Sequence, residues 1–193
     1  MEIQFLKGQS IRPYIPHLGR LRMTVFKEYP YLYEGELGTE TDYLRTYIDC
    51  SESVLIIVKD NDRVVGASTA LPLEYETIEC QTPFLNANIP INEVFCFGES
   101  VLLPEYRGQG LYREFFKQRE NAARNYGSKI AAFCAVEREK NDNRQPENYQ
   151  PLDEIWHYFN YTKHPVLKTK IEWKQIGHKE SSLNTMSFWI KTL

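Results

Sequence analysis

The pattern of apolar and polar positions is clearest in the middle of the chain. Residues 94–103 (VFCFGESVLL) are mostly apolar and too few to span a membrane, which is typical of a buried strand. Residues 111–127 (LYREFFKQRENAARNYG) place Leu111, Phe115 and Tyr126 at helical intervals and end at a glycine. The pattern predicts a strand, a tight turn and a helix. The unpaired N–H groups at the start of such a helix favour an anion.

Similar patterns predict the other elements. Strands are expected at 2–7, in a hairpin over 53–73 that turns at Asp60-Asn61-Asp62, and at 129–137, 168–177 and 184–193. Helices are expected in the second half of 11–29, from Thr39 or Thr41 to about Cys50, within 74–92, and over 152–161, with loops at 29–38 and 138–151. This order predicts one mixed α/β domain over residues 1–193, with a central sheet of about seven strands flanked by helices.

Composition and charge narrow the class of partner. Hydrophobic residues make up 42% of the 193 positions and charged residues 25%, as in soluble globular proteins. The formal net charge of −3 argues against a general nucleic-acid binder, which usually carries a strongly basic face. We therefore expect neither nucleic acid nor a membrane as a partner, and a small or locally bound substrate instead.

The N-terminal residues and the cysteines indicate a cytoplasmic protein. The first residues lack a basic segment followed by an apolar core, so no secretory signal is predicted. The four cysteines are widely spaced and form no CxxC pair, which disfavours a zinc site, a redox motif or any other metal centre. Cys96 and Cys134 lie in apolar strand patterns, where packing in the core is favoured over a role as nucleophile.

The glycine-rich turn Arg107-Gly108-Gln109-Gly110 allows several interpretations. The two glycines can simply permit a sharp corner and close packing of helix on strand. A nucleotide P-loop would need GxxxxGK[ST], and a dinucleotide fold would need GxGxxG after the first strand. Neither pattern is present. Two interpretations therefore remain: a purely structural corner, and a turn that binds an anion through its backbone.

The position of this turn in the chain points to a family. Residues 101–112 read VLLPEYRGQGLY, so that Arg107-x-x-Gly110 follows the fourth expected strand after a short apolar stretch and a proline. This arrangement resembles the GNAT superfamily of acyl-CoA-dependent N-acetyltransferases, whose signature is R/Q-x-x-G-x-G/A. The order of elements is similar from about residue 3 to 190, and the specific motif covers residues 98–127. Tyr112 stands where the signature has a small residue.

The resemblance implies acetyl-CoA as co-substrate. In that family the amides of the turn hold the pyrophosphate of coenzyme A, and the preceding strand end pairs with the pantetheine arm. The cofactor-binding residues implied here are Val101, Leu102, Leu103, Arg107, Gly108, Gln109, Gly110, Leu111 and Tyr112. The chemistry agrees, because glycines allow close backbone approach to the anion and an arginine adds charge-assisted hydrogen bonds. Tyr112 is expected to pack beside the cofactor or to shift the helix slightly.

Acetyl transfer also needs a base for the amine and a proton for the leaving thiolate. Glu99 is the acidic residue well inside the fourth strand and is the candidate base, unless it lies at an edge or pairs with an arginine. The family's usual acid is a tyrosine on the helix after the fifth strand, and here Trp156 takes that position. We expect Trp156 to pack, with Tyr158 or the adjacent His157 as weak substitutes, or with water as the proton donor.

The acceptor site is expected in the loop after the first helix. This loop carries Tyr31, Tyr33 and Glu34 among other tyrosines and glutamates, which suit a cationic amine, although the same residues could pack on the sheet or face solvent. We therefore expect an N-acetyltransferase acting on a primary amine of a small molecule or protein. The alternative is a non-catalytic acyl-CoA-binding or regulatory module. The apolar last strand leaves a homodimer possible, although we favour the core for these residues.

Overall fold

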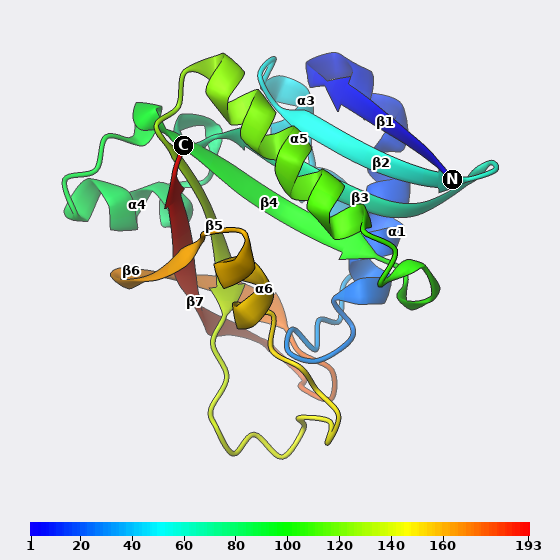
Figure 1. The fold of residues 1–193 in the computed structure, drawn as a ribbon. Coiled ribbons are helices and arrows are strands. Elements are labelled where there is room, and N and C mark those ends of the chain that lie inside the picture. The colour runs from blue at the N-terminus through cyan, green and yellow to red at the C-terminus, as the bar shows by residue number, and fades with distance from the viewer.

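The computed structural model describes all residues from 1 to 193. One mixed sheet contains all seven strands in the order β1-β2-β3-β4-β5-β7-β6, as Figure 1 shows. The strands are β1 (Glu2–Lys7), β2 (Val54–Asp60), β3 (Arg63–Pro72), β4 (Val94–Leu102), β5 (Ile130–Val136), β6 (Thr162–Lys174) and β7 (Ser181–Thr192). Each neighbouring pair is antiparallel except β4 and β5, which are parallel.

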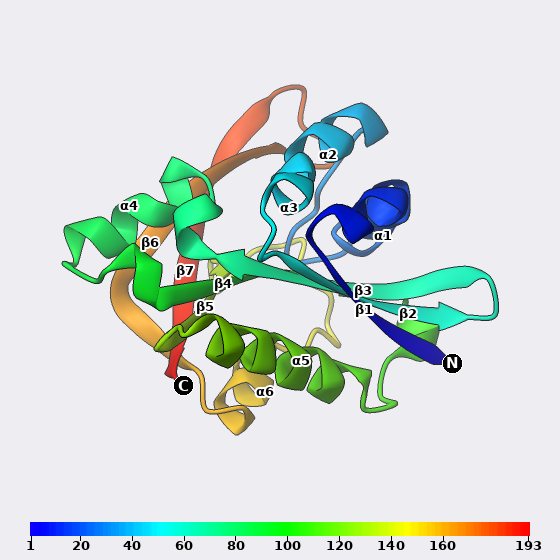
Figure 2. The same cartoon turned by 90° about the horizontal axis from the view of Figure 1, so that it is seen from above.

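Helices cover both faces of the sheet. They are α1 (Ile15–Val25), α2 (Leu37–Tyr43), α3 (Arg45–Asp49), α4 (Ile78–Asn86), α5 (Leu111–Tyr126) and α6 (Asp153–Tyr158). In Figure 2, α1, α2 and α3 lie on one side of the sheet, and α5 and α6 lie on the other. We call the first side the α1 face and the second the α5 face. The main core cluster of buried residues lies between these layers and the sheet.

The central strands separate part of the way along their length. β4 and β5 pair only at Val94, Phe95 and Cys96 of β4, and beyond Cys96 the edge of β4 that faces β5 has no strand partner. The opposite edge of β4 still pairs with β3 as far as Leu102. The two parallel strands therefore diverge beyond Cys96. We refer to the region in which β4 and β5 no longer pair as the β4–β5 opening.

A bulge in β4 turns its side chains at this opening. The pairing with β3 shifts register between Ser68 and Ala70, so that Gly98 and Glu99 together oppose Thr69. Gly98 is exposed although it lies in the middle of an otherwise buried strand. A side chain there would collide with the hydroxyl groups of Tyr47 and Thr69. Only glycine therefore leaves room for this arrangement.

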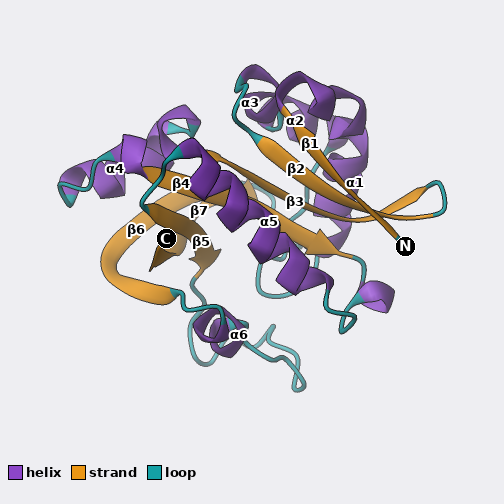
Figure 3. Ribbon diagram, turned by 45° about the horizontal axis from the view of Figure 1, so that its top comes forward, coloured by secondary structure: helices purple, strands orange, loops and turns teal.

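Helix α5 is delimited by two glycines. Gly110 at its start and Gly127 after its end have φ angles of +79° and +93°, which L side chains rarely adopt. Figure 3 shows the helix crossing the sheet after the connecting loop. Its apolar side, with Phe115 and Phe116, is buried against the sheet, as the helical spacing predicted. The strand, turn and helix predicted from 94–127 are all present.

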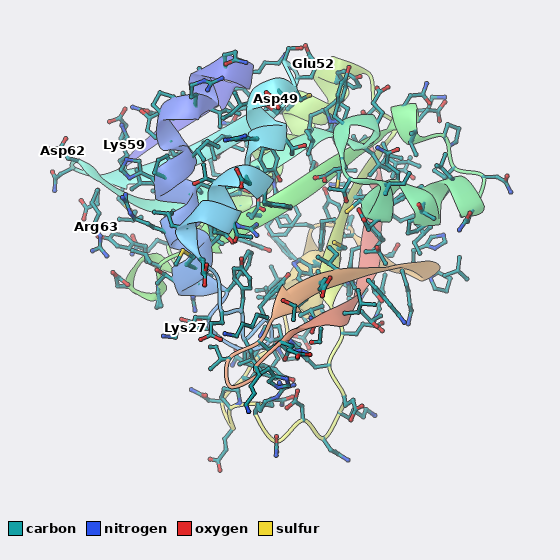
Figure 4. The ribbon with its side chains drawn as sticks, turned by 180° about the vertical axis from the view of Figure 1, so that it is seen from behind. Lys27, Asp49, Glu52, Lys59, Asp62 and Arg63 are labelled. Carbon is teal, nitrogen blue, oxygen red and sulfur yellow. The ribbon has the colours of Figure 1, made fainter.

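The predicted β hairpin is also present. β2 and β3 are joined by Asn61 and Asp62, and Asn61 has a φ of +51°, which suits a tight two-residue turn. Asp62 and Arg63 project at the exposed tip of the hairpin (Figure 4). The first five residues of β2 are buried, because β1 and β3 pair with it and helices cover the sheet.

Several predicted boundaries were wrong. The expected helix from Thr39 or Thr41 to about Cys50 is two helices, α2 and α3, which meet at Leu44. α1 begins at Ile15 rather than in the second half of 11–29, and β7 begins at Ser181 rather than 184. β6 begins at Thr162 rather than 168, and its register shifts between Lys163 and Lys168. That shift contains Pro165, which has no N–H group to donate to a ladder and is tolerated in an edge strand.

The apolar residues of the last strand and the cysteines pack as expected. Met186, Phe188 and Trp189 are at most 4% exposed. Cys96 is buried and Cys134 half-buried, and burial raises the pKa of both thiols, which disfavours the reactive thiolate. None of the helices has the length and apolar character that crossing a bilayer requires.

Candidate functional site

The turn before α5 presents a row of unused hydrogen-bond donors. The backbone N–H groups of five consecutive residues, 108 to 112, have no acceptor in the chain. Gly108 and Gly110 have φ angles of +75° and +79°, and the space around their α-carbons is open. Unpaired N–H groups at the start of a 16-residue helix favour an anion.

Arg107 lies beside this turn on the surface. Its guanidinium donates to Glu28 at 3.0 Å and to the backbone oxygen of Leu102 at 3.2 Å. Both partners in the Arg107–Glu28 pair are about half exposed, and such pairs add little stability. An anionic ligand can therefore replace Glu28 as the partner of Arg107 at small energetic cost.

The strand end before the turn is buried but has a free backbone edge. Val101, Leu102 and Leu103 are at most 9% exposed, and their side chains belong to the main core cluster. Val101 and Leu102 pair with β3 on one edge, while the other edge borders the β4–β5 opening. The Leu102 oxygen accepts from Arg107, and the groups of this second edge that have no partner can bind an extended polar ligand as a further strand would.

Glu99 lies on the α1 face of the opening, with both carboxylate oxygens in use. Oε1 forms an ion pair with Arg22 of α1. Oε2 accepts hydrogen bonds from Thr69 at 2.5 Å and from Tyr47 at 3.1 Å. The structure thus contains the arginine pairing that was the alternative to a free base. A carboxylate held by three donors must give up one of them before it can accept a proton.

Glu76 is a second carboxylate on this face, and the sequence did not single it out. It follows β3, is 8% exposed, and accepts one hydrogen bond, from the N–H of Thr77 at 3.2 Å to Oε2. Oε1 has no hydrogen-bond donor and keeps contact with solvent. Burial and the negative charge of Glu99 raise the pKa of Glu76 to about 7. That pKa suits a base working near neutral pH.

Tyr112, Trp156 and Arg119 form a second group on the α5 side of the opening. The indole Nε1 of Trp156 donates to the hydroxyl of Tyr112 at 3.1 Å. Trp156 also packs against Phe133 and Trp189, with ring centroids 5.1 and 4.9 Å apart, so the predicted packing is accompanied by a hydrogen bond. Arg119 is buried without an ion-pair partner.

The other candidate acids lie away from this group. Tyr158 is 66% exposed, and its hydroxyl accepts a hydrogen bond from Arg113 at 3.2 Å. Its ring lies on the outer surface between α5 and α6, in a shallow depression lined by polar and charged residues. His157 is exposed and its ring meets the edge of Trp189. Neither Tyr158 nor His157 forms a hydrogen bond with Glu99.

The tyrosine-rich loop is divided between packing and polar contacts. Tyr31 packs against Phe26 and Trp173, and burial raises the pKa of its hydroxyl. Tyr33 donates to Glu40 at 2.5 Å, and Glu40 in turn accepts a hydrogen bond from Arg22. Tyr31 thus packs at the end of α1, and Tyr33 is joined to Arg22 of α1 through Glu40.

Glu34 lies apart from these two tyrosines. It is exposed and pairs with Lys174 at the end of β6, at 3.0 Å. The backbone N–H of Glu34 also donates to the oxygen of Lys174 at 2.9 Å. The loop is therefore fixed to the end of β6 at Glu34.

Comparison with known proteins gives a consistent picture of the fold. No family model matches the sequence, and no curated protein matches it. A ribosomal-protein-alanine N-acetyltransferase from Brucella melitensis is similar in structure, with a TM-score of 0.62, 11% sequence identity, and all of both chains covered. A protein from Salmonella typhimurium, solved with its cofactor acetyl-CoA, has a TM-score of 0.57, 10% identity, and coverage of 99% of this chain and 94% of its own.

A third structure names the family. A protein from Desulfovibrio desulfuricans assigned to the GNAT family has a TM-score of 0.58 and 9% identity, with 99% of each chain covered. At such low identities the likeness concerns the fold. The seven-stranded mixed sheet, the diverging β4 and β5, and the turn before α5 accordingly identify this chain as having the GNAT acetyltransferase fold.

Proposed function

We propose that this protein transfers an acyl group, acetyl in the simplest case, from acyl-CoA to a primary amine. The observation that carries the proposal is the row of five unpaired N–H groups beside the β4–β5 opening. This row lies on the α5 face, and a cluster of carboxylates lies on the α1 face. The opening would allow two substrates held on opposite faces to meet.

Coenzyme A matches the first half of this arrangement. Its pyrophosphate would accept hydrogen bonds from the N–H groups of residues 108 to 112, and Arg107 would add a charged donor. Its pantetheine arm carries two amides, which would pair with the free backbone edge of β4 near Val101 and Leu102. The thioester would then extend into the opening. Bound acyl-CoA supplies the activated acyl group; the protein positions it.

A cationic amine matches the second half. Arg22 carries one positive charge, while Glu40 and Glu99 together carry two negative charges, and Glu76 adds a third when ionised. A buried group with excess negative charge attracts an ammonium ion and stabilises it. Glu76, which has the free oxygen, would accept the proton that makes the amine nucleophilic. Glu99 would fix Arg22 and the β4 bulge around it, or take the proton itself if Arg22 moved.

The acceptor loop would complete the amine site. The ring of Tyr31 packs against Phe26 at the end of α1, and Tyr33 joins the carboxylates through Glu40. Aromatic rings beside carboxylates suit a cation. Glu34, which is already paired with Lys174 at the end of β6, would act at the outer edge of this site.

A second candidate is a module that binds acyl-CoA without transferring the acyl group. It is favoured by the three donors that hold Glu99 and by the tryptophan in place of the expected tyrosine. Both candidates require the same cofactor site. They differ in whether thiol is released from acetyl-CoA.

Calorimetric titration with acetyl-CoA and measurement of thiol release test the two candidates. We expect binding and faster release of CoA in the presence of primary amines. Binding without release, for amines that include a polyamine, an aryl amine and a lysine peptide, would favour the non-catalytic module. No binding at millimolar acetyl-CoA would contradict both candidates.

A further inference from the structure

Arg119 is an unusual residue on the buried side of α5. It is 2% exposed, has no carboxylate partner, and makes one hydrogen bond, from Nε to the backbone oxygen of Phe115 at 3.3 Å. Its guanidinium lies over the rings of Phe97 and Phe116, at 4.4 and 5.0 Å from their centroids. Burying an unpaired cation is costly, so stability alone gives no reason for it.

Tyr112 is a polar group on the same side of α5 that can use this charge. The two residues are seven positions apart on α5, two helical turns along one side, and long helical side chains lean toward the N-terminus. The positive charge of Arg119 and the hydroxyl of Tyr112 interact electrostatically. Tyr112 accepts the hydrogen bond from Trp156, while its own hydroxyl proton has no acceptor in the chain. The tyrosine is therefore a donor without a partner.

The position of Tyr112 relative to the strands is informative. Trp156 packs on Phe133, the first residue of β5 beyond the last pair with β4. Arg119 lies over Phe97, the first residue of β4 beyond that pair. The hydroxyl of Tyr112 is thus linked through Trp156 to Phe133, where β5 leaves β4 at the β4–β5 opening.

We propose that Tyr112 is the catalytic proton donor to the leaving thiolate, with Trp156 and Arg119 as positioning residues. This proposal rests on the proposed acyl transfer. The amine nitrogen forms a bond to the thioester carbon, the carbon–sulfur bond breaks, and its electron pair goes to sulfur. The Tyr112 proton then moves to sulfur and gives CoA thiol. The proton that the amine has lost then returns to the phenolate, so the reaction is balanced.

The surroundings of Tyr112 suit this step. Burial raises the pKa of its hydroxyl, while the Trp156 hydrogen bond and the Arg119 charge lower it by stabilising the phenolate. Its hydroxyl accepts from Trp156 of α6, and its ring packs against Phe116 of its own helix and Phe159 after α6. The charged group that acts on it is Arg119 of α5. The tyrosine that the family resemblance led us to expect on the helix after β5 would thus be supplied by α5.

Conservative substitution of the tyrosine tests the proposal. CoA release from acetyl-CoA is measured with hydroxylamine, with primary amines and with water as acceptors. For Tyr112→Phe we expect kcat to fall by about 100-fold or more while the dissociation constant of acetyl-CoA stays within a few fold. Trp156→Phe should give a smaller loss of kcat. Tyr126→Phe, the same change at the far end of α5, is the matched control and should retain full activity.

A second measurement separates proton donation from packing and remains available if Tyr112→Phe folds poorly. Replacing Tyr112 by 3,5-difluorotyrosine lowers the phenol pKa and keeps the ring, so the basic limb of the kcat–pH profile should move to lower pH. An unmoved basic limb, a Tyr112→Phe enzyme with unchanged kcat, or a loss confined to Tyr158→Phe would each overturn the proposal. If the unmodified enzyme releases no CoA with any acceptor, the proposed function fails, and this proposal fails with it.

Discussion

Arg22 of α1 binds two buried carboxylates at once, Glu99 of β4 and Glu40 of α2. Burial opposes the charge on Arg22, but the carboxylates outweigh it, so the pKa of Arg22 is raised. Through Glu40 the network reaches Tyr33, and through Glu99 it reaches Tyr47 and Thr69. One arginine thus connects the acceptor loop, the first helices and the central bulge.

Removal of Arg22 should therefore destabilise the fold strongly. Arg22→Met leaves Glu99, which is 3% exposed, and Glu40, which is 1% exposed, without their cation. We expect a loss of about 3–5 kcal/mol in the free energy of unfolding, measured with urea. The double variant Arg22→Met/Glu99→Gln should recover part of it, since one unpaired charge is gone. A loss below 1 kcal/mol for Arg22→Met would show that the ion pair is dispensable.

Local signals in the sequence explain which predictions were correct. The strand, turn and α5 depend on glycines and on apolar spacing within about thirty residues, and these patterns are visible without knowing the fold. The Arg22–Glu99 pair joins positions 77 residues apart, so the sequence could only offer an arginine partner as an alternative. The packing of Trp156 was expected, but its hydrogen bond to Tyr112 depends on how α6 meets α5.

Glu76 was missed for a related reason. It lies in the polar stretch 74–92, which predicts a short helix with loops and gives no sign of burial. In the structure it follows β3 closely, and its negative charge acts on the thiols of Cys96 and Cys134 at the point where β4 and β5 diverge. A buried glutamate after a strand looks like any exposed glutamate in sequence.

Glu76 should make stability depend on pH. Its pKa rises from 4.5 to about 7 on folding, so the folded state binds the proton more tightly than the unfolded state. The contribution of Glu76 to the free energy of unfolding is fully present below pH 4.5. It falls by about 3 kcal/mol in total as pH rises to about 7. Relative to Glu76→Gln, the unmodified protein should lose most of this amount between pH 5 and pH 8 in urea unfolding. Glu147→Gln, in an exposed loop, is the control; parallel profiles for all three proteins would contradict the prediction.

The two carboxylates should differ in their effect on turnover. Glu76→Gln removes an oxygen free to accept a proton, and we expect kcat for amine acetylation at pH 7 to fall by about 100-fold. Glu99→Gln keeps the shape of the side chain but weakens its interaction with Arg22. It should therefore lower kcat less, and stability more, than Glu76→Gln does. Both rates are measured with the same amine across pH 6–9. A larger rate loss for Glu99→Gln, at equal folded fraction, would assign the base to Glu99.

Gly98 should tolerate no side chain. A β-carbon there would lie 2.5 Å from the Thr69 hydroxyl and would also collide with Tyr47, and both groups hold Glu99. Gly98→Ala is therefore expected to cost about 1–3 kcal/mol in urea unfolding. Gly38→Ala is the matched control, because nothing lies within 4 Å of its β-carbon in helix α2, and alanine should stabilise it by about 0.5–1 kcal/mol. Equal effects at the two positions would mean that the β4 bulge relaxes freely.

Arg107 should contribute to cofactor affinity and little to stability. Its pair with Glu28 is exposed, so Arg107→Ala should leave the free energy of unfolding within about 0.5 kcal/mol. Loss of a charged donor to the pyrophosphate should weaken acetyl-CoA binding by about 1.5–3 kcal/mol, which titration calorimetry resolves. Because the interaction is electrostatic, the difference should shrink as salt is raised. Arg45→Ala, which removes a more exposed arginine of α3, should bind acetyl-CoA normally. Unchanged affinity in Arg107→Ala would place the pyrophosphate beyond the reach of this side chain and leave the five backbone N–H groups as its only donors.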